Sequence, residues 1–389
     1  MKLKLLVFSP FYTPHIGGLE SHADEFNKHL TKRGVNISIF TPRLPSSALE
    51  EEVVHENVRI IRFPAWEPIH NYPVPKFWIP KFWNLLKEAL SSKPEILISR
   101  TRFFSTSLLA LLLSKIKHIP LIHIEHGSDY AIFNSPVKTL LGKWYDHTLG
   151  RLVLRYSDAL VANSAASASF VKKISGRDCA TIYRGIEGDA ICTIAPDKDF
   201  LNKKHGRLGI GFVGRLIDGK GVANLLAALS HIPRQKFIVA CIGDGPERKK
   251  LEQDTKKYSL EEEVLFFGHR KHPEAIALMK ACDIIVNPSY TEGLPTSIIE
   301  AALCEKAIIA TNVGGTPEII SGNGDGFLVP AGDINVLREK LGFLIEHPDI
   351  RVQFGRNALL IIQNKFNWDT SAEKYLHVFE KTLKKNSKK

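Results

Sequence analysis

The sequence predicts an α/β protein with two open parallel sheets, and three observations support this. Its 389 residues match the length of two domains of roughly 100–200 residues each. Strand-like runs alternate with amphipathic segments, as in parallel sheets with crossover helices. The alternation occurs in two series, separated by a mixed, weakly periodic stretch near Ile186–Arg207. We therefore expect an N-terminal domain over 1–190, a linker over 191–207 and a C-terminal domain over 208–366.

The first series contains the strand-like runs LKLLVFSP, VNISIFTP, PEILISR, PLIHIEHG and DALVANS. After the first run, the loop FYTPHIGG leads into a helix that ends near Gly34. His22 and His29 fall on this helix, where we expect solvated side chains. The second series contains LGIGFVGRL, KFIVACIGDGP, VLFFGH, CDIIVNPS and KAIIATN. An amphipathic helix over about 367–385 follows, which could pack back on the N-terminal domain.

The composition is that of a soluble globular protein, with 44% apolar and 24% charged residues. The five cysteines are scattered without a CxxC pair, which argues against a disulfide framework or a zinc site and favours a reducing cytoplasm. The longest apolar stretch, near Leu108–Leu113, is too short to span a membrane. The N-terminal apolar run stops at Pro10, too early for a signal peptide. We expect a cytoplasmic protein.

The formal net charge of +11 fits nucleic acid, an anionic membrane surface or a phosphorylated substrate. No helix-turn-helix, RNP-like or zinc-finger pattern is present in the sequence, so nucleic acid is not an expected partner. The segment NYPVPKFWIPKFWNLLKEAL repeats Lys-Phe-Trp, at Lys76–Trp78 and Lys81–Trp83. Aromatic residues beside lysines suit a membrane interface, but a loop and helix packed on the domain explains them equally well. Peripheral association with the inner face of the cell membrane is therefore an open expectation.

Two glycine-rich segments lie next to strands. Gly17 and Gly18 precede a helix, where glycine lets backbone N–H groups approach an anion; a plain turn is the alternative. The run Gly209–Gly214 fits GxGxxG. The dinucleotide fingerprint, however, follows a strand and opens a helix, whereas these glycines lie before and inside a strand, with the helix starting near Val222. We reject a dinucleotide-binding site there.

Charged residues follow two strands of the second series. Arg215 and Lys220 lie on a glycine-bent loop, where a guanidinium fork and a lysine charge suit a diphosphate. The alternative is that both are solvated surface residues, and we favour diphosphate binding. In EGLPTSIIE, Glu292 should lie in a loop and Glu300 one turn into a helix begun by Pro295, with Thr296 and Ser297 hydroxyls able to bond free N–H groups. The carboxylates suit sugar or ribose hydroxyls, and a hydrolase acid/base pair is the alternative.

The run His123-Ile124-Glu125-His126-Gly127 resembles a metal cluster. Neighbours in a strand alternate faces, so His123 and His126 should point to opposite sides and could not hold one ion. His126 at the strand end is the better candidate for a site residue. Because ligands bind at the carboxyl ends of parallel strands, we expect the site in a cleft between the two domains.

The motifs PHIGGLE, EHG, VANS, VGRLIDGKG, GDGPER, VLFFGH, CDIIVNPSYTEGLPTSIIEA, NVGGTPEII and DGFLV occur in the order seen in one family. Nearly the whole chain resembles the family 4 retaining glycosyltransferases (glycosyl transferases group 1), which have the GT-B fold of two doubly wound parallel-sheet domains facing each other across a cleft. EGLPTSIIEA after a strand and Pro-Ser is the most specific motif.

The resemblance implies roles on the donor side. Arg215 and Lys220 would hold the donor diphosphate and stabilise its departure, and Gly17 and Gly18 would approach the distal phosphate. Glu300 would bind the ribose hydroxyls.

The same resemblance places Glu292 on hydroxyls of the transferred sugar and His126 near the reacting centre. Gly268, His269 and Arg270 would lie near the base, and four residues would line the sugar–phosphate pocket: Gly293, Leu294, Pro295 and Thr296.

It also implies a hexosyltransferase acting on a UDP- or GDP-sugar by front-face transfer, with the leaving phosphate taking the acceptor proton and the domains closing over the donor. No tightly bound cofactor and no divalent metal are expected. A glycan or lipid-linked acceptor in cell-envelope polysaccharide, lipopolysaccharide or glycolipid synthesis would fit. The chain departs from the family at YRGIE, with Arg184 and Glu187, which stands where the family often has an Asn-Gly pair followed by Asp, and no role is transferred there. The alternatives are a sugar-nucleotide epimerase, a nucleic-acid-binding protein and a catalytically inactive nucleotide-sugar-binding module.

Overall fold

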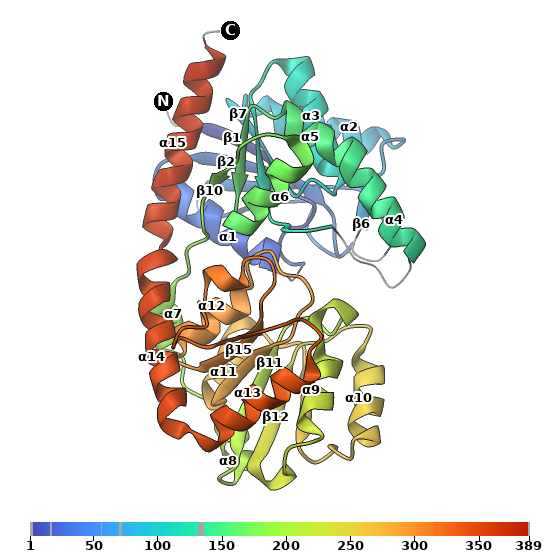
Figure 1. Ribbon diagram of the computed structural model, residues 1–389. Coiled ribbons are helices and arrows are strands. Elements are labelled where there is room, and N and C mark those ends of the chain that lie inside the picture. The colour runs from blue at the N-terminus through green and yellow to red at the C-terminus, as the bar shows by residue number, and fades with distance from the viewer. Residues whose placement is uncertain (1–2, 16–17, 56, 70–71, 131–135, 388–389) are drawn as a thin grey trace. The chain divides into compact units, whose positions relative to one another are not determined.

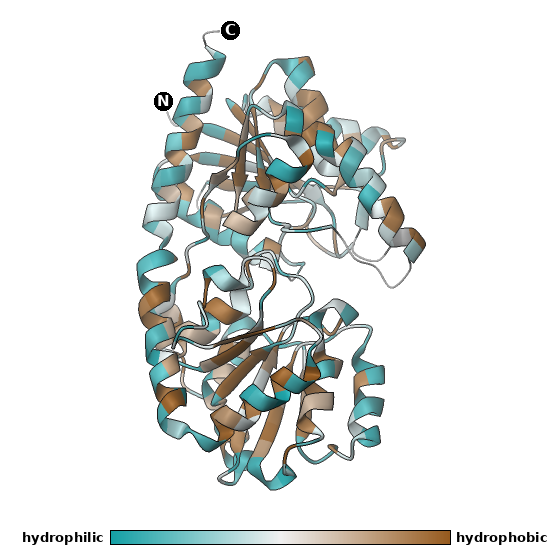
Figure 2. Cartoon of the chain, viewed as in Figure 1, coloured by the Kyte–Doolittle hydropathy of each residue, from teal (hydrophilic) through white to brown (hydrophobic). Residues whose placement is uncertain are grey.

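Two separate sheets organise the chain in the computed structural model, which describes residues 3–15, 18–55, 57–69, 72–130 and 136–387 (Figure 1). The contacts divide the chain into a first unit, residues 1–185 with 367–389, and a second unit, residues 186–366. In each unit helices cover the sheet, and the strands are the most hydrophobic part of the ribbon (Figure 2).

The sheet of the first unit has the strand order β10-β9-β8-β7-β1-β2-β4-β3, and every pair except β3–β4 is parallel. A separate antiparallel hairpin joins β5 to β6. The strands are β1 (Lys4–Phe8), β2 (Asn36–Pro42), β3 (Glu51–Val54), β4 (Val58–Phe63), β5 (Ala65–Ile69), β6 (Tyr72–Pro75), β7 (Ile96–Arg100), β8 (Leu121–Glu125), β9 (Ala159–Ala162) and β10 (Ala180–Thr181). The helices are α1 (Gly18–Thr31), α2 (Pro80–Ser91), α3 (Ser105–Lys117), α4 (Pro136–Tyr145), the π-helical turn η1 (Asp146–Gly150), α5 (Arg151–Tyr156), α6 (Ala165–Ser175) and α15 (Trp368–Asn386).

Two apolar clusters fill the faces of this sheet. On one face α1 and α15 pack on the strands, and Trp368, Tyr375 and Phe379 of α15 are part of that core. On the other face α2 and α3 cover a cluster that contains Phe82. The first unit is therefore built from both ends of the chain.

The sheet of the second unit has six parallel strands in the order β13-β12-β11-β14-β15-β16. The strands are β11 (Leu208–Val213), β12 (Phe237–Ile242), β13 (Val264–Gly268), β14 (Ile284–Asn287), β15 (Ala307–Thr311) and β16 (Phe327–Val329). The helices are α7 (Gly188–Cys192), α8 (Lys198–Lys204), α9 (Val222–Leu229), α10 (Arg248–Lys257), α11 (His272–Ala281), α12 (Thr296–Leu303), α13 (Ile334–Glu346) and α14 (Pro348–Lys365), with 3₁₀ turns η2 (Asp218–Lys220), η3 (Arg234–Lys236) and η4 (Thr316–Glu318). On one face of this sheet an apolar core joins the strands to α9 and α13.

The expected linker over 191–207 is not a linker. It contains the end of α7 and all of α8, and it belongs to the second unit. Asp197 caps α8 by accepting from the N–H of Phe200, whose ring is fully buried. The mixed composition of this stretch hid a short helix whose buried residue is Phe200 and whose Lys204 bonds Asp283.

The GxGxxG run does not form a strand-to-helix turn. Gly209 and Gly211 lie inside β11, and α9 begins at Val222. A Cβ on Gly211 would lie 2.6 Å from the Cδ1 atom of Ile285, so this glycine allows close packing between strands. The rejection of a dinucleotide fingerprint is confirmed.

Candidate functional site

Four loops at the carboxyl ends of the second unit's strands are joined through their backbones. The loop after β11 touches the loop after β14, where the N–H of Tyr290 donates to the carbonyl of Gly219 at 2.9 Å. It also touches the loop after β12, where the N–H of Leu216 donates to the carbonyl of Asp244 at 2.9 Å. The loop after β15 joins them through the N–H of Gly315, which donates to the carbonyl of Gly293 at 3.0 Å. Strand β11 lies between β12 and β14 in the middle of the sheet. In open α/β sheets, ligands bind beyond the carboxyl ends of such central strands.

Glycines allow these loops to approach one another. A Cβ on Gly243 would lie 1.9 Å from the carbonyl oxygen of Gly214, and one on Gly245 would lie 2.3 Å from that of Leu216. Gly221 has a φ of +65°, and its Cβ would lie 2.1 Å from the carbonyl oxygen of Pro288. Larger residues would force the loops apart. Gly221 of GKG and the two glycines of GDGP therefore fix the loops that carry the charged candidates.

The structure brings Lys220 and Glu292 into direct contact. The Lys220 ammonium donates to Glu292 Oε1 at 2.6 Å, and the same oxygen accepts from Ser289 Oγ at 2.7 Å and from Asn287 Nδ2 at 3.3 Å. Glu292 is only 9% exposed, whereas Arg215, on the same loop as Lys220, is exposed to solvent. An oriented carboxylate thus lies against one cation, Lys220, on a loop that also carries Arg215, and these groups can bind sugar hydroxyls and phosphate oxygens.

Glu300 lies on α12, one turn from its start, and pairs with a residue that the sequence analysis did not select. His272, the first residue of α11, has its Nε2 atom 2.9 Å from Glu300 Oε1. Pro295 is the N-cap of α12 and makes no side-chain cap bond. Thr296 and Ser297 are the first two residues of the helix.

Gly293, Leu294 and Pro295 form the turn between β14 and α12, and Leu294 and Pro295 are buried. The segment Gly268–Arg270 follows β13. Gly268 has a φ of +67° and its carbonyl accepts from the N–H of Gly243 at 3.0 Å, while His269 and Arg270 are exposed. These residues follow the carboxyl ends of two strands of the same sheet.

In the first unit, Glu125 organises the turn that carries His126. Glu125 is fully buried at the end of β8 and accepts from the N–H groups of His126 at 2.9 Å and Gly127 at 2.8 Å. It also pairs with Arg102 at 3.2 Å, and Arg102 pairs with the buried Asp146 at 2.9 Å. Burial alone would raise the pKa of Glu125, but the charge of Arg102, His123 and the Gly127 N–H together hold it well below its ordinary value. Sequence spacing gave no sign of this ion-pair network.

His126 lies against a second histidine and near a buried arginine. Its ring is 4.9 Å from that of His22, edge to face. The Arg100 guanidinium is fully buried at the end of β7 and donates to His22 Nδ1 at 3.0 Å, so the His22 Nε2 atom carries the proton. Burial and the charge of Arg100 lower the pKa of His126 to about 3. His126 is therefore neutral at neutral pH and can donate or accept a single hydrogen bond.

The expectation that His22 and His29 are solvated is wrong for His22, which is 2% exposed. Trp368 of α15 covers both: its ring lies 5.7 Å from that of His22 and stacks 5.1 Å from that of His29. Arg184, for which no role was expected, pairs with Glu25 of α1 at 2.8 Å.

Gly17 lies outside the described residues, and Gly18 is the first residue of α1. Over the described part of the chain, no group of three or more His, Cys, Asp or Glu residues could hold a metal ion. His123 bonds Ser99 Oγ at 2.8 Å instead. No described helix has both the length and the apolar content that crossing a membrane requires.

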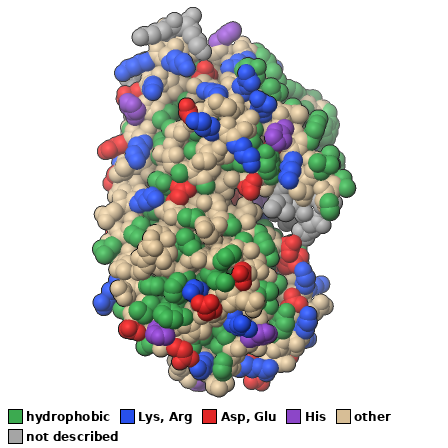
Figure 3. All heavy atoms as spheres, in the orientation of Figure 1, with side chains coloured by type: hydrophobic (Ala, Val, Ile, Leu, Met, Phe, Trp, Pro, Cys, Tyr) green, Lys and Arg blue, Asp and Glu red, His purple; other side chains and the backbone are tan. Residues whose placement is uncertain are grey.

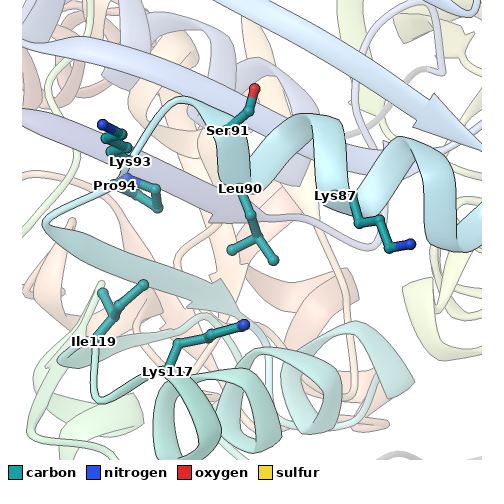
Figure 4. Close-up of a pocket in the computed structure, with 7 residues that line it drawn as sticks. All are labelled: Lys87, Leu90, Ser91, Lys93, Pro94, Lys117 and Ile119. Atoms are coloured by element: carbon teal, nitrogen blue, oxygen red, sulfur yellow. The ribbon is translucent and has the colours of Figure 1, made fainter.

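One cavity of about 510 Å³ lies in the first unit, away from the candidate residues (Figure 4). It opens beside the C-terminal ends of α2 and α3, at the amino ends of β7 and β8. Its lining is Lys87, Leu90, Ser91, Lys93, Pro94, Lys117 and Ile119. Because ligands of parallel sheets bind at the opposite ends of the strands, this cavity is not part of the site.

Comparisons with known proteins place the chain in a family. Residues 16–189 match the family model described as Glycosyltransferase Family 4, and residues 194–360 match Glycosyl transferases group 1. The chain is 37% identical to an uncharacterized glycosyltransferase of Methanocaldococcus jannaschii, over 98% of this chain and 99% of the relative.

Solved structures share the fold. Sucrose-phosphate synthase from Thermosynechococcus elongatus superposes with a TM-score of 0.80 at 19% identity, over 98% of this chain and 99% of that one. Anabaena HepE, solved in complex with UDP-glucose, superposes with a TM-score of 0.76 at 21% identity, over 97% and 100%. The chain therefore belongs to the family 4 glycosyltransferases and has their two-domain GT-B fold.

Proposed function

We propose that this glycosyltransferase moves a hexose from a UDP- or GDP-sugar to an acceptor hydroxyl and retains the anomeric configuration. The observation that carries the proposal is the contact between Lys220 and the buried Glu292, on loops that also present Arg215. Charged groups that are already oriented beside a buried turn can stabilise a departing diphosphate, because few protein or water dipoles have to reorient during the reaction.

In this proposal the Lys220–Glu292 pair changes partners when the donor binds. Arg215 and Lys220 take the diphosphate oxygens, and Glu292, still held by Ser289 and Asn287, takes hydroxyls of the transferred sugar. A lysine that already neutralises a carboxylate need not be desolvated alone before the substrate arrives.

Glu300 binds the ribose hydroxyls, and His272 orients its carboxylate. The turn at Gly293–Thr296 lines the sugar–phosphate pocket, and Gly268, His269 and Arg270 lie near the base. Neutral His126 contacts the sugar near the reacting carbon, and Gly17 and Gly18 approach the distal phosphate. The leaving phosphate accepts the acceptor proton, so transfer needs neither a metal nor a protein nucleophile.

The acceptor we propose is a glycan or a lipid-linked molecule used in cell-envelope polysaccharide, lipopolysaccharide or glycolipid synthesis. The protein would act in the cytoplasm, peripherally at the inner face of the cell membrane. The high positive charge of the chain supports this location.

The first test is a thermal-shift screen against UDP-, GDP- and ADP-sugars, with Lys220→Ala and Glu300→Ala alongside the natural protein. A ligand at a hundred times its dissociation constant adds about 2.7 kcal/mol to the stability, which gives a clear shift. We expect one nucleotide family to stabilise the protein and both variants to lose most of that effect. Equal shifts in the variants would contradict the site assignment.

The second test is the anomeric configuration of the product. Once a donor and an acceptor are found, proton NMR of the glycoside formed gives its configuration directly. We expect the configuration of the donor, and an inverted product would contradict the retaining mechanism. Donor conversion without an acceptor would instead favour an epimerase.

A further inference from the structure

The helix that runs from α4 through η1 to α5 exposes an apolar row to solvent. Val137, Leu140, Leu141 and Trp144 are each 60–68% exposed, and Leu152 and Tyr156 continue the row at 43% and 52%. Large apolar side chains normally occur singly on a protein surface, so a contiguous row needs a partner. Figure 3 shows hydrophobic side chains gathered along the edge where Figure 1 places α4.

The π-helical turn keeps this row in line. In an α-helix, residues four apart lie on one face, and Leu140 and Trp144 follow this spacing. A π-helical turn holds one extra residue. Across Asp146–Gly150 that extra residue leaves Leu152 and Tyr156 on the face of Trp144, while Asp146 turns inward to Arg102. The π-turn thus buries the acid and aligns the apolar side chains.

A basic row lies beside the apolar one. Lys143, His147, Arg151 and Arg155 recur every fourth residue, and all four are exposed. Lys143 and His147 also contact Tyr130, with the Lys143 ammonium 5.6 Å from the ring centroid and His147 Nε2 2.9 Å from the hydroxyl. The only acid in residues 136–156 is the buried Asp146. This face therefore presents positive charge without an exposed carboxylate.

The neighbouring helix α3, which packs against α5, repeats the pattern. Leu112 and Ile116 are 58% and 59% exposed, Lys115 and Lys117 are exposed beside them, and residues 105–117 contain no acid. An apolar row flanked by cations is the arrangement of helices that lie in the interface of an anionic bilayer, with the apolar side chains among the acyl chains and the cations at the head groups.

We propose that the first unit docks on an anionic lipid bilayer through the α4–η1–α5 helix and the exposed side of α3. The role of this docking rests on the proposed function: an enzyme docked on a bilayer acts on an acceptor that is itself anchored in the membrane. It assigns the docking surface to Leu140, Trp144 and Arg151, and not to the Lys-Phe-Trp repeats.

Those repeats are less suited to a bilayer. Phe82 is fully buried in the core of the unit, and the indole of Trp83 donates to the carbonyl of Phe77 at 2.8 Å. Trp78 remains 66% exposed, nearly the same as Trp144 at 62%. It therefore provides a matched control on a different part of the same unit.

The test is flotation of the purified full chain with phosphatidylcholine vesicles containing about 30% phosphatidylglycerol, and with pure phosphatidylcholine vesicles. We expect binding to the anionic vesicles that weakens as salt is added. Leu140→Ser with Trp144→Ser should lower the partition constant by tenfold or more, because two exposed apolar side chains are removed. Trp78→Ser should bind like the natural protein, and Arg151→Gln with Arg155→Gln should lose about fivefold for each charge.

Three results would overturn the proposal: unchanged binding of the Leu140/Trp144 variant, loss of binding in Trp78→Ser, or a dimer in sedimentation that the Leu140/Trp144 variant converts to monomer. Fluorescence quenching by brominated lipid gives a second readout that should be lost in Trp144→Ser alone. Each variant is also tested for its thermal shift with the donor nucleotide, which should be unchanged. A natural protein that floats with vesicles but binds no nucleotide sugar would contradict the proposed function and leave the docking surface standing.

Discussion

Alanine at Gly221 should damage the proposed donor site, whereas alanine at Gly219 should not. Both glycines flank Lys220 in the turn after β11. Gly221 has a φ of +65°, and its Cβ would lie 2.1 Å from the carbonyl oxygen of Pro288. At Gly219 a Cβ meets nothing within 4 Å. The two substitutions are chemically identical and differ only in the space and the backbone conformation that receive them.

The size of the effect at Gly221 follows from two terms. A left-handed conformation costs alanine about 1–2 kcal/mol, and overpacking against rigid backbone adds about 1–3 kcal/mol. Alanine also lowers the conformational entropy of the unfolded chain, which raises the free energy of unfolding by about 0.4–1 kcal/mol. We expect a net loss of about 1–5 kcal/mol for Gly221→Ala, and a change between zero and a gain of about 1 kcal/mol for Gly219→Ala.

The loop geometry changes as well. Contacts under 3.0 Å do not persist, so the distance from this Cβ to the Pro288 oxygen must grow by at least 0.9 Å from its 2.1 Å. Lys220, which we propose holds the donor diphosphate, immediately precedes Gly221. A displacement of about 1 Å at a group with that role can cost on the order of a hundredfold in rate. We therefore expect a large loss of kcat/KM in Gly221→Ala beyond its loss of stability.

The assays are urea denaturation for the free energy of unfolding and steady-state transfer or donor hydrolysis for kcat/KM. Both variants are measured at a temperature where they are fully folded. A free energy of unfolding for Gly221→Ala within about 0.5 kcal/mol of that of the natural protein would be typical of a neutral surface substitution. That result would contradict the close contact with Pro288. Equal damage in Gly219→Ala would show that any side chain in this loop disrupts it.

Three further predictions concern the buried charges and the donor carboxylate. The pKa of His126 is lowered to about 3, so between pH 6.5 and 3 the unfolded chain binds a proton that the folded chain does not. The free energy of unfolding should therefore fall as the pH falls through that window, by about 2 kcal/mol at pH 5. Denaturation of His126→Phe at several pH values should show a smaller dependence of stability on pH. Arg102→Met leaves two buried carboxylates without their cation and should cost about 3–5 kcal/mol in urea unfolding, while Arg59→Met at a more exposed pair should cost less than about 1 kcal/mol. Glu300→Gln should raise KM for the donor with little change in kcat, because a ribose contact is the same in the ground and transition states; a fall in kcat alone would contradict that role.

The sequence predicted the strands, and the loops that carry the proposed site residues, well because their signals are local. Strand runs, the helix start after Gly221 and the carboxylate at Glu292 each depend on a few neighbouring residues. The resemblance to a family then gave these loops a chemistry that spacing alone left open. The contact between Lys220 and Glu292 joins residues that are 72 positions apart, and no local pattern predicts it.

Burial by distant elements explains what the sequence analysis missed. His22 looked solvated because the helix it lies on has polar neighbours, but Trp368 comes from the other end of the chain to cover it. Arg102 and Asp146 pair across 44 positions, and composition treats both as surface charges. The apolar row at Leu140 and Trp144 reads as one side of an ordinary amphipathic helix, and only the structure shows that this side faces solvent.

The place of α15 in the first core affects how the protein is made. A ribosome completes residues 186–366, a continuous unit with its own apolar core, before it releases residues 367–387. The first unit cannot complete its core before residues 367–387 are made, because Trp368, Tyr375 and Phe379 cover one face of its sheet. During synthesis the unit that begins the chain should therefore be the last to finish folding, with the apolar face of α1 exposed until then. A chain truncated after Phe366 should show a protease-resistant second unit and a protease-sensitive first one.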